Sequence, residues 1–135
     1  MKKFSFLIAL ILSVAGMAAQ EGIQFATDSW QEVLKKAKEE NKIIFVDAYA
    51  TWCGPCKLMS KDVFTDEKVG KFYNSRFINV KIDMEKGEGL DLAQKYQVKA
   101  YPSLLFVNGE GELVHRKAGY HDVAQFLELG RTALN

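Results

Sequence analysis

The sequence predicts an α/β protein in which a mixed central sheet carries helices on both faces. Three observations support this fold class. Apolar runs of strand length alternate with segments of helical periodicity, which favours parallel strands joined through helices. Near the C-terminus, two strand-like runs flank the hairpin signal Asn108–Gly111, which adds an antiparallel edge. The chain beyond residue 19 has a size that suits one domain with one core.

A capping box predicts the start of the first helix. Ser29 and Glu32 have the spacing at which each side chain accepts a hydrogen bond from the backbone N–H of the other residue. The apolar residues that follow share one helical face, which is expected to pack on the core. They are Trp30, Val33, Leu34 and Ala37.

The next apolar run, residues 42–49, predicts a central strand, because a strand covered on both faces is apolar almost without interruption. A helix is expected to begin near Pro55, since proline is favoured in the first turn of a helix. The segment Phe64–Asp66 interrupts this helix, and Asp66 is placed to cap a second helical segment.

The remaining elements follow from the same patterns. Residues 77–83 predict the next strand and residues 90–96 a short helix. Residues 103–107 and 112–117 predict the two strands of the hairpin, and residues 121–134 a closing helix. The predicted order is therefore helix, strand, helix, strand, helix, strand, strand, helix.

The N-terminal segment, residues 1–19, has the order of features of a secretory signal peptide. Two lysines come first, an almost wholly apolar stretch follows over residues 4–15, and small residues close the segment. The apolar stretch is shorter than the roughly 20 residues with which a helix spans a bilayer. An uncleaved N-terminal anchor is the alternative interpretation.

Cleavage is expected after Ala18 or Ala19, which leaves residues 20–135 as one domain in the periplasm or secreted from the cell. This domain is expected to be a monomer without stable membrane insertion. Loss of the two N-terminal lysines takes the 18 basic residues to 16, against 17 acidic ones. So balanced a charge argues against a nucleic-acid-binding surface, which needs a concentrated basic face.

The chain has only two cysteines, Cys53 and Cys56, at the predicted junction of the central strand and the next helix. A C-x-x-C pair at such a junction is typical of a redox site, because the helix N-terminus stabilises the reactive thiolate. Cys53, nearer the helix start, is expected to be the nucleophile and the more exposed of the two. Cys56 is expected to be the more buried, resolving cysteine, which closes an internal disulfide.

Other classes of site are disfavoured by the composition. Two cysteines are too few for a disulfide-stapled scaffold. A zinc site needs about four ligands, and two cysteines with two distant histidines do not form such a set. We therefore expect no metal and no cofactor.

Two segments carry a specific resemblance to a known family. Residues 45–57, which include the C-x-x-C pair, closely resemble the active-site segment of thioredoxins, and residues 100–106 resemble the cis-proline segment of that family. The match covers about residues 24–134, and Gly119 falls where the family has a glycine near its last helix. The helix after the motif is more similar to secreted thioredoxin-like reductases, such as the C-terminal domain of DsbD. The resemblance implies a thioredoxin fold.

Asp47 lies on the predicted central strand, where so apolar a setting is expected to bury the carboxyl and raise its pKa. The resemblance implies that Asp47 accepts a proton from the resolving cysteine, Cys56. Thioredoxins often place a lysine near this carboxylate. Here Asn79 falls at that position and Lys81 is the next residue on the same face, which leaves the partner of Asp47 open.

The Tyr101–Pro102 bond is expected to be cis, and the resemblance implies that this proline faces the C-x-x-C pair and forms the substrate-binding edge. Tyr101 replaces the small aliphatic residue usual before the proline, which points to a different substrate preference. The residues assigned to substrate binding are Trp52, Tyr101, Pro102 and Gly119. Those assigned to redox tuning are Trp52, Gly54, Pro55 and Lys57.

The dipeptide between the cysteines is Gly-Pro, as in the reducing thioredoxins. The resemblance therefore implies an exported thiol–disulfide oxidoreductase that acts mainly as a protein disulfide reductase. Its expected partners are disulfide-containing protein substrates and a membrane thiol carrier as electron donor. Two alternatives stay open, a thioredoxin-fold binding or chaperone module with dispensable cysteines, and a disulfide isomerase.

Overall fold

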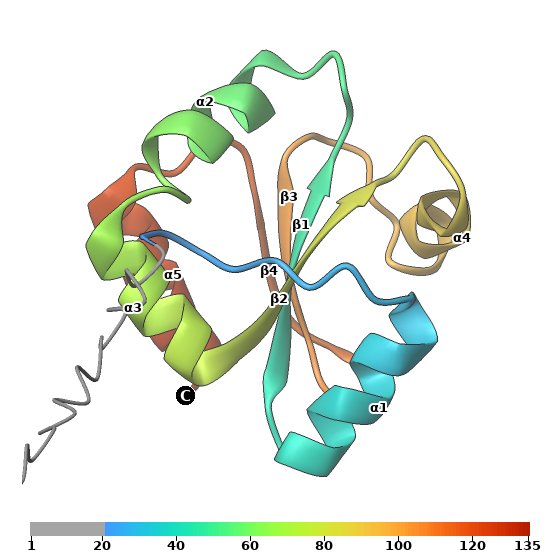
Figure 1. The fold of residues 1–135 in the computed structure, drawn as a ribbon. Coiled ribbons are helices and arrows are strands. Elements are labelled where there is room, and N and C mark those ends of the chain that lie inside the picture. Colours follow the sequence, from blue (N-terminus) through green and yellow to red (C-terminus); the bar gives the residue numbers. More distant parts are fainter. Residues whose placement is uncertain (1–20) are drawn as a thin grey trace, which may run out of the picture.

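The computed structural model describes residues 21–135 (Figure 1). The predicted signal peptide, residues 1–19, and its cleavage position lie outside the described residues. The helices and strands follow one another in the order α1 (Trp30–Glu40), β1 (Ile43–Tyr49), α2 (Gly54–Asp62), α3 (Glu67–Arg76), β2 (Phe77–Asp83), α4 (Glu88–Lys95), β3 (Ser103–Val107), β4 (Leu113–Ala118) and α5 (Val123–Ala133).

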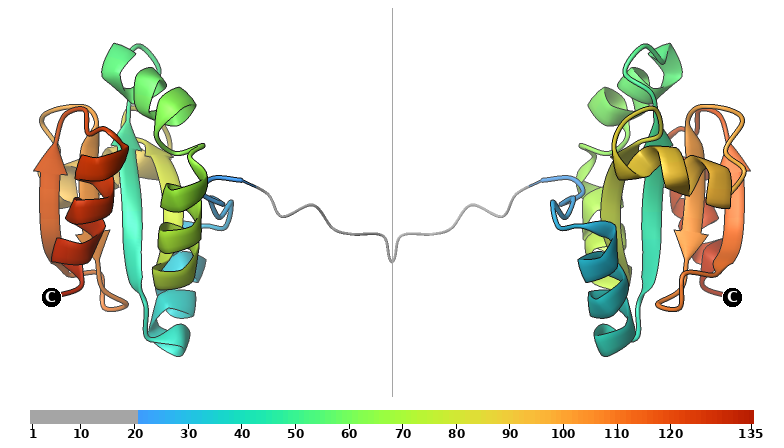
Figure 2. Two further views of the ribbon diagram at one scale, coloured as in Figure 1. Left: turned by 90° about the vertical axis from the view of Figure 1, so that its left-hand side faces the viewer. Right: turned by 90° about the vertical axis from the view of Figure 1, so that its right-hand side faces the viewer.

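The four strands form one mixed sheet in the order β2-β1-β3-β4. Strand β1 pairs in parallel with β2 and antiparallel with β3, and β3 forms the predicted antiparallel hairpin with β4. Helices α3 and α5 lie in front of the sheet in the left view of Figure 2, and α1 and α4 in the right view. The predicted α/β class, with a mixed sheet and helices on both faces, is therefore confirmed.

Strand β1 divides the core because its side chains alternate between the two faces of the sheet. Ile44, Val46 and Ala48 pack with α1 and α4, whereas Phe45 packs with α2, α3 and α5. On the second face, the ring of Tyr73 stacks on that of Phe126 at a centroid distance of 4.2 Å. The same alternation turns residue 47 toward the face covered by α2, which is the helix that carries the cysteines.

Side-chain caps fix the starts of two helices as predicted. The Ser29 capping box is present, and Asp66 accepts hydrogen bonds from two backbone N–H groups at the start of α3. Two helix starts differ from the prediction by two residues, and the other bounds by one at most. Helix α4 begins two residues early because Gly87 turns the chain at a positive φ of 54°, a conformation that glycine adopts readily. Helix α5 begins two residues late because Asp122 and Gln125 form a second capping box.

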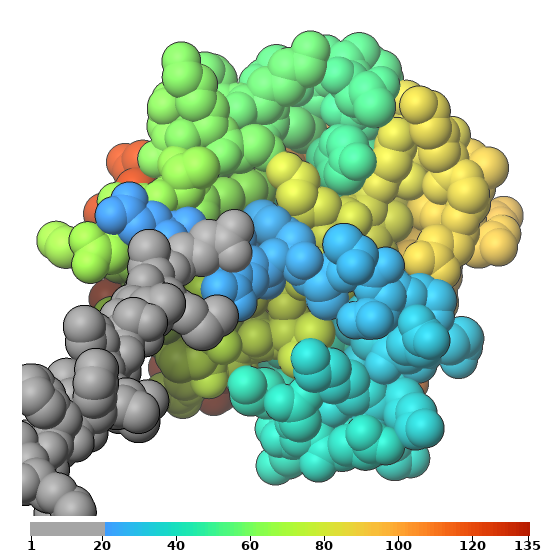
Figure 3. Space-filling model, viewed as in Figure 1, coloured from blue at the N-terminus to red at the C-terminus, as the bar shows by residue number. Residues whose placement is uncertain are grey.

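The segment before α1 was not assigned to any element from the sequence. It closes the free edge of β2, where the Ala26 N–H donates to the Asn79 carbonyl at 2.8 Å and Phe25 forms an isolated bridge with the same residue. In Figure 3 this segment, in blue, crosses the surface toward α1. No helix within residues 21–135 is long and apolar enough to cross a membrane.

Candidate active site

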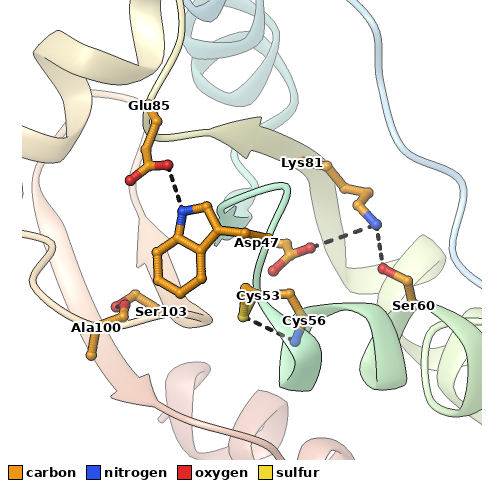
Figure 4. The surroundings of a disulfide bond; sticks show 9 residues. Asp47, Cys53, Cys56, Ser60, Lys81, Glu85, Ala100 and Ser103 are labelled. Carbon is orange, nitrogen blue, oxygen red and sulfur yellow. Dashed lines mark hydrogen bonds and ion pairs between the residues drawn. A yellow bond between two sulfur atoms is a disulfide. The ribbon is translucent and has the colours of Figure 1, made fainter.

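Cys53 and Cys56 form a disulfide at the start of α2, directly after the loop that follows β1 (Figure 4). Cys53 is the N-cap residue, and its sulfur accepts a hydrogen bond from the Cys56 backbone N–H at 3.2 Å. Gly54 and Pro55 occupy the first two helical positions, and both are exposed. A helix start directs free N–H groups and the positive end of the helix dipole at this sulfur, so negative charge on it would be stabilised.

The predicted difference in exposure between the cysteines is wrong. Cys53 is 2% exposed and Cys56 is 4% exposed, so both are buried and Cys53 is not the more accessible one. The reason is a side chain from a distant part of the chain. Tyr101, together with Tyr49, packs against the cluster that Ala50 forms with the two cysteines. The Tyr101 ring also contacts the ring of Trp52 edge-to-face, with ring centroids 5.8 Å apart.

Trp52 lies at the surface with 66% of its area exposed, and its position is fixed on two sides. One side is the Tyr101 ring, and on the other the indole Nε1–H donates to Glu85 Oε1 at 2.7 Å. Glu85 lies in the loop between β2 and α4 and approaches the site from there (Figure 4). Glu85 could not be singled out from the sequence, because nothing in its local pattern indicates which loop faces the cysteines.

The four residues assigned to substrate binding are linked to one another, and Pro102 among them is buried. Trp52 contacts Tyr101, and the Tyr101–Pro102 peptide bond is cis. The Pro102 carbonyl accepts a hydrogen bond from the Gly119 N–H at 2.8 Å. Gly119 has a φ of +90°, which is strained for any residue with a Cβ atom. The loop after β4 is thereby joined to the segment that precedes β3.

Asp47 is 1% exposed, and neither carboxyl oxygen has a hydrogen-bond partner within residues 21–135. The register of β1 and β2 places Lys81 beside it, with the Lys81 Nζ 3.7 Å from Asp47 Oδ2. This pairing settles the question that the sequence left open, since Asn79 instead donates from its side chain to the Tyr73 carbonyl. Burial raises the pKa of Asp47 from 3.8 to about 6, against the opposing charge of Lys81.

A cavity of about 520 Å³ opens beside Cys56, on the side where Lys81 lies. Three lysines line it and give it a positive charge, and one of them, Lys57, was assigned to redox tuning. Ser60 also lines the cavity and was missed from the sequence. Its position four residues after Cys56 places both side chains on one face of α2, which is the signal that could have found it.

Comparison with known proteins decides the family. Residues 30–134 match the thioredoxin-like domain family. This chain belongs to that family. An H-type thioredoxin from Oryza sativa subsp. indica is 37% identical over 99 residues, which cover 71% of this chain and 76% of that protein.

Further relatives connect the thioredoxin-like chain to disulfide exchange. The thiol:disulfide interchange protein DsbD from Yersinia pestis is 32% identical over 95 residues, which are 68% of this chain but only 16% of that protein. A solved structure of a provisionally assigned disulphide isomerase from Bacteroides thetaiotaomicron is 47% identical, covers 87% of this chain and 98% of its own, and has a TM-score of 0.76. With the C-x-x-C disulfide, these relatives identify a thioredoxin-like thiol–disulfide oxidoreductase.

Tyr101→Val is expected to increase, several-fold, the rate at which glutathione reduces the Cys53–Cys56 disulfide. The physical reason is that the tyrosine ring packs on the cysteines and leaves Cys53 almost without exposed area. The measurement is the time course of free-thiol formation in the oxidised protein. Tyr101→Phe is the matched control, because it keeps the ring and should keep the original rate. Equal rates for wild type and Tyr101→Val would show that the ring does not limit access.

Proposed function

We propose that this protein is exported and acts mainly as a protein disulfide reductase. The observation that carries the proposal is the Cys53–Cys56 disulfide at a helix N-terminus, with Gly-Pro between the cysteines. In this proposal, residues 1–19 are a signal peptide, and residues 20–135 are a monomeric domain that works in the periplasm or outside the cell. The 32% identity to DsbD, a thiol:disulfide interchange protein, supports a function in thiol–disulfide exchange.

The proposed reaction is a two-step thiol–disulfide exchange. The reduced protein attacks a substrate disulfide through the Cys53 thiolate. A Cys53–substrate disulfide forms, the substrate S–S bond breaks, and one substrate sulfur leaves as a thiolate. The Cys56 thiolate then attacks the Cys53 sulfur, which restores the Cys53–Cys56 bond and releases the second substrate thiolate. Two electrons thus pass from the dithiol to the substrate disulfide.

The helix N-terminus assists this reaction in two ways. It stabilises the Cys53 thiolate as the attacking group, which raises the fraction of reactive protein at neutral pH. It also makes Cys53 a good leaving group during re-reduction, when the second thiol of an electron donor breaks the Cys53–donor disulfide, because a sulfur of lower pKa leaves faster. We assign Gly54, Pro55, Lys57 and Trp52 to this tuning, because they surround the helix start.

Asp47 is proposed to accept the proton that Cys56 must lose before it attacks. A general base works best when its pKa lies near the working pH. The pKa of about 6 for this buried carboxyl meets that condition, whereas an exposed aspartate with a pKa near 4 would be a weaker base. The Asp47 side chain lies among the residues that surround the disulfide in Figure 4.

The substrate is proposed to be an extended segment of a disulfide-containing protein. Trp52, Tyr101 and Gly119 are proposed to form its binding surface and the buried Pro102 to shape it, with backbone N–H and C=O groups of the segment before β3 pairing with the substrate. The oxidised protein must then be reduced again. A membrane thiol carrier is the proposed donor. Its dithiol would be oxidised to a disulfide as the Cys53–Cys56 bond is reduced to two thiols.

The function is tested by two assays on the wild-type protein. We expect it to accelerate dithiothreitol-dependent precipitation of insulin, which requires net reduction of disulfides. The second assay is reactivation of scrambled ribonuclease by catalytic amounts of the pre-reduced protein without further reductant, which requires only rearrangement of disulfides. Activity in the second assay alone would support the isomerase alternative. The 47% identity to a structure assigned as a disulphide isomerase favours testing that alternative. Inactivity in both would support a binding or chaperone module.

Export is tested separately by the mass of the protein recovered from its native host. A mature chain that begins at residue 19 or 20 in the periplasmic or secreted fraction would support cleavage after Ala18 or Ala19. A chain of full length retained in the membrane fraction would instead support the uncleaved anchor.

A further inference from the structure

The position of the Lys81 ammonium is not set by Asp47 alone. Lys81 Nζ donates a hydrogen bond to Ser60 Oγ at 2.5 Å, whereas its distance from Asp47 Oδ2 is 3.7 Å. The second distance is too long for a direct hydrogen bond, so the attraction between lysine and aspartate is Coulombic. In Figure 4, dashed lines join the ammonium both to the Asp47 carboxylate and to the Ser60 hydroxyl.

Aromatic rings hold the ammonium from other directions. Lys81 Nζ lies 5.4 Å from the ring centroid of Phe25, and 5.5 Å from those of Tyr49 and Phe64. All three distances are within the range of cation–π contacts. The rings belong to the segment before α1, to β1 and to the loop after α2. The Lys81 side chain is 31% exposed on the cavity wall, and Ser60 is its one hydrogen-bond acceptor among the described residues.

We propose that Ser60 is a positioning residue whose hydroxyl holds the Lys81 ammonium away from the Asp47 carboxylate and so keeps that carboxylate basic. This inference rests on the proposed function, in which Asp47 accepts the proton of Cys56. A lysine ammonium has three N–H donors, and each can bond only to an acceptor within reach. Among the described residues, the Asp47 carboxylate is then the nearest acceptor that remains without the Ser60 oxygen, and a direct charge-assisted hydrogen bond would stabilise its ionised form.

No other group around Asp47 would take over the effect of the Lys81 position on the Asp47 carboxylate. Lys81 is the charged side chain that β2 presents to it, and β3 presents Leu104, which does not titrate. Helix α2 contributes the two cysteines, which are joined in this structure. It also contributes Lys57 and Lys61, which line the same cavity but form no ion pair with Asp47 among the described residues. On β1 itself, Tyr49 is the nearest titratable neighbour, and desolvation first, then the charges of Asp83 and Asp47, raise its pKa. It therefore stays neutral in the range where Asp47 titrates.

The test follows the titration of the Asp47 carboxyl carbon by NMR in the oxidised protein, which requires no enzyme activity. Ser60→Ala is expected to lower the Asp47 midpoint by about one unit, the effect of a newly formed close ion pair. Ser60→Thr keeps the hydroxyl and should keep the wild-type midpoint. Lys81→Met should raise the midpoint, and Ser60→Ala should add no further change in the Lys81→Met background.

The same variants give a kinetic readout. In the reduced protein, the low-pH limb of the rate of mixed-disulfide resolution should move to lower pH in Ser60→Ala and stay in place in Ser60→Thr. An unchanged or raised Asp47 midpoint in Ser60→Ala would overturn the inference, as would an equal shift in the Lys81→Met background. If the midpoints behave as expected while Asp47→Asn leaves resolution unchanged at every pH, the positioning by Ser60 stands and the proposed role of Asp47 fails.

Discussion

Replacing Cys53 with serine is expected to lower the rate of insulin reduction to that of dithiothreitol alone. The proposed reaction begins with attack by the sulfur at the helix N-cap, where the Cys56 N–H already points at it. A serine hydroxyl at that position would not attack a disulfide, so no mixed disulfide forms. The measurement is insulin turbidity with equal amounts of wild-type and variant protein.

Cys56→Ser is the matched comparison, because it should stop the same reaction one step later. Cys53 can still attack, but no second thiol resolves the product, so the variant should accumulate as a mixed disulfide with its substrate. Non-reducing gels would show this species for Cys56→Ser and not for Cys53→Ser. The reverse pattern, with adducts formed only by Cys53→Ser, would exchange the two roles.

Asp47→Asn is expected to change how stability depends on pH by about 3 kcal/mol. The carboxyl has an ordinary pKa of 3.8 and a pKa of about 6 in the folded protein. A difference of about two units corresponds to about 3 kcal/mol between the two protonation states. This value applies because the side chain is buried and neither oxygen accepts a hydrogen bond from the described residues.

The direction of this change in stability follows from the pH at which the folded and the unfolded state each lose the Asp47 proton. Below pH 3.8 the carboxyl is neutral in both states, and it imposes no penalty on folding. Between pH 3.8 and about 6 the unfolded chain ionises while the folded chain keeps the proton, so the free energy of unfolding falls as the pH rises. Above pH 6 the full penalty remains. Asp47→Asn, which cannot ionise, should therefore gain stability relative to wild type from acidic to neutral pH.

Urea unfolding of the oxidised proteins at pH 3.5, 5 and 7.5 measures this difference. Asp62→Asn is the matched control, because it removes an exposed carboxyl from the end of α2 and should follow the wild-type pH dependence. A constant difference between Asp47→Asn and wild type over the whole range would contradict the buried, charged aspartate. The constant part of the difference reports the burial of an amide in place of the acid.

Local signals predicted the fold well because they act within a few residues. The strand Phe77–Asp83 has the predicted bounds, and the cap at Asp66 separates α2 from α3 as the sequence indicated. The boundary of α4 was missed because it depends on Gly87, whose positive φ is not encoded in the periodicity of the helix. The strand-like edge before α1 was missed because one bridge leaves almost no sequence pattern.

The site was harder to predict because its details depend on contacts between distant segments. The sequence placed Cys53, Cys56 and Asp47, but the exposure of Cys53 depends on Tyr101, which lies nearly fifty residues further along the chain. The partner of Asp47 depends on the register between β1 and β2, and a shift of two residues along β2 would bring Asn79 in place of Lys81. Ser60 enters only once that register is known.

The two tryptophans give the molecule separate optical reporters. Trp30 is buried against Tyr96 in the core, whereas Trp52 is exposed and adjoins the disulfide in sequence. Fluorescence from Trp30 therefore follows unfolding, and fluorescence from Trp52 follows the opening and closing of the neighbouring sulfur–sulfur bond. Because the chain has no third tryptophan, a Trp30→Phe protein would report its redox state without any added dye.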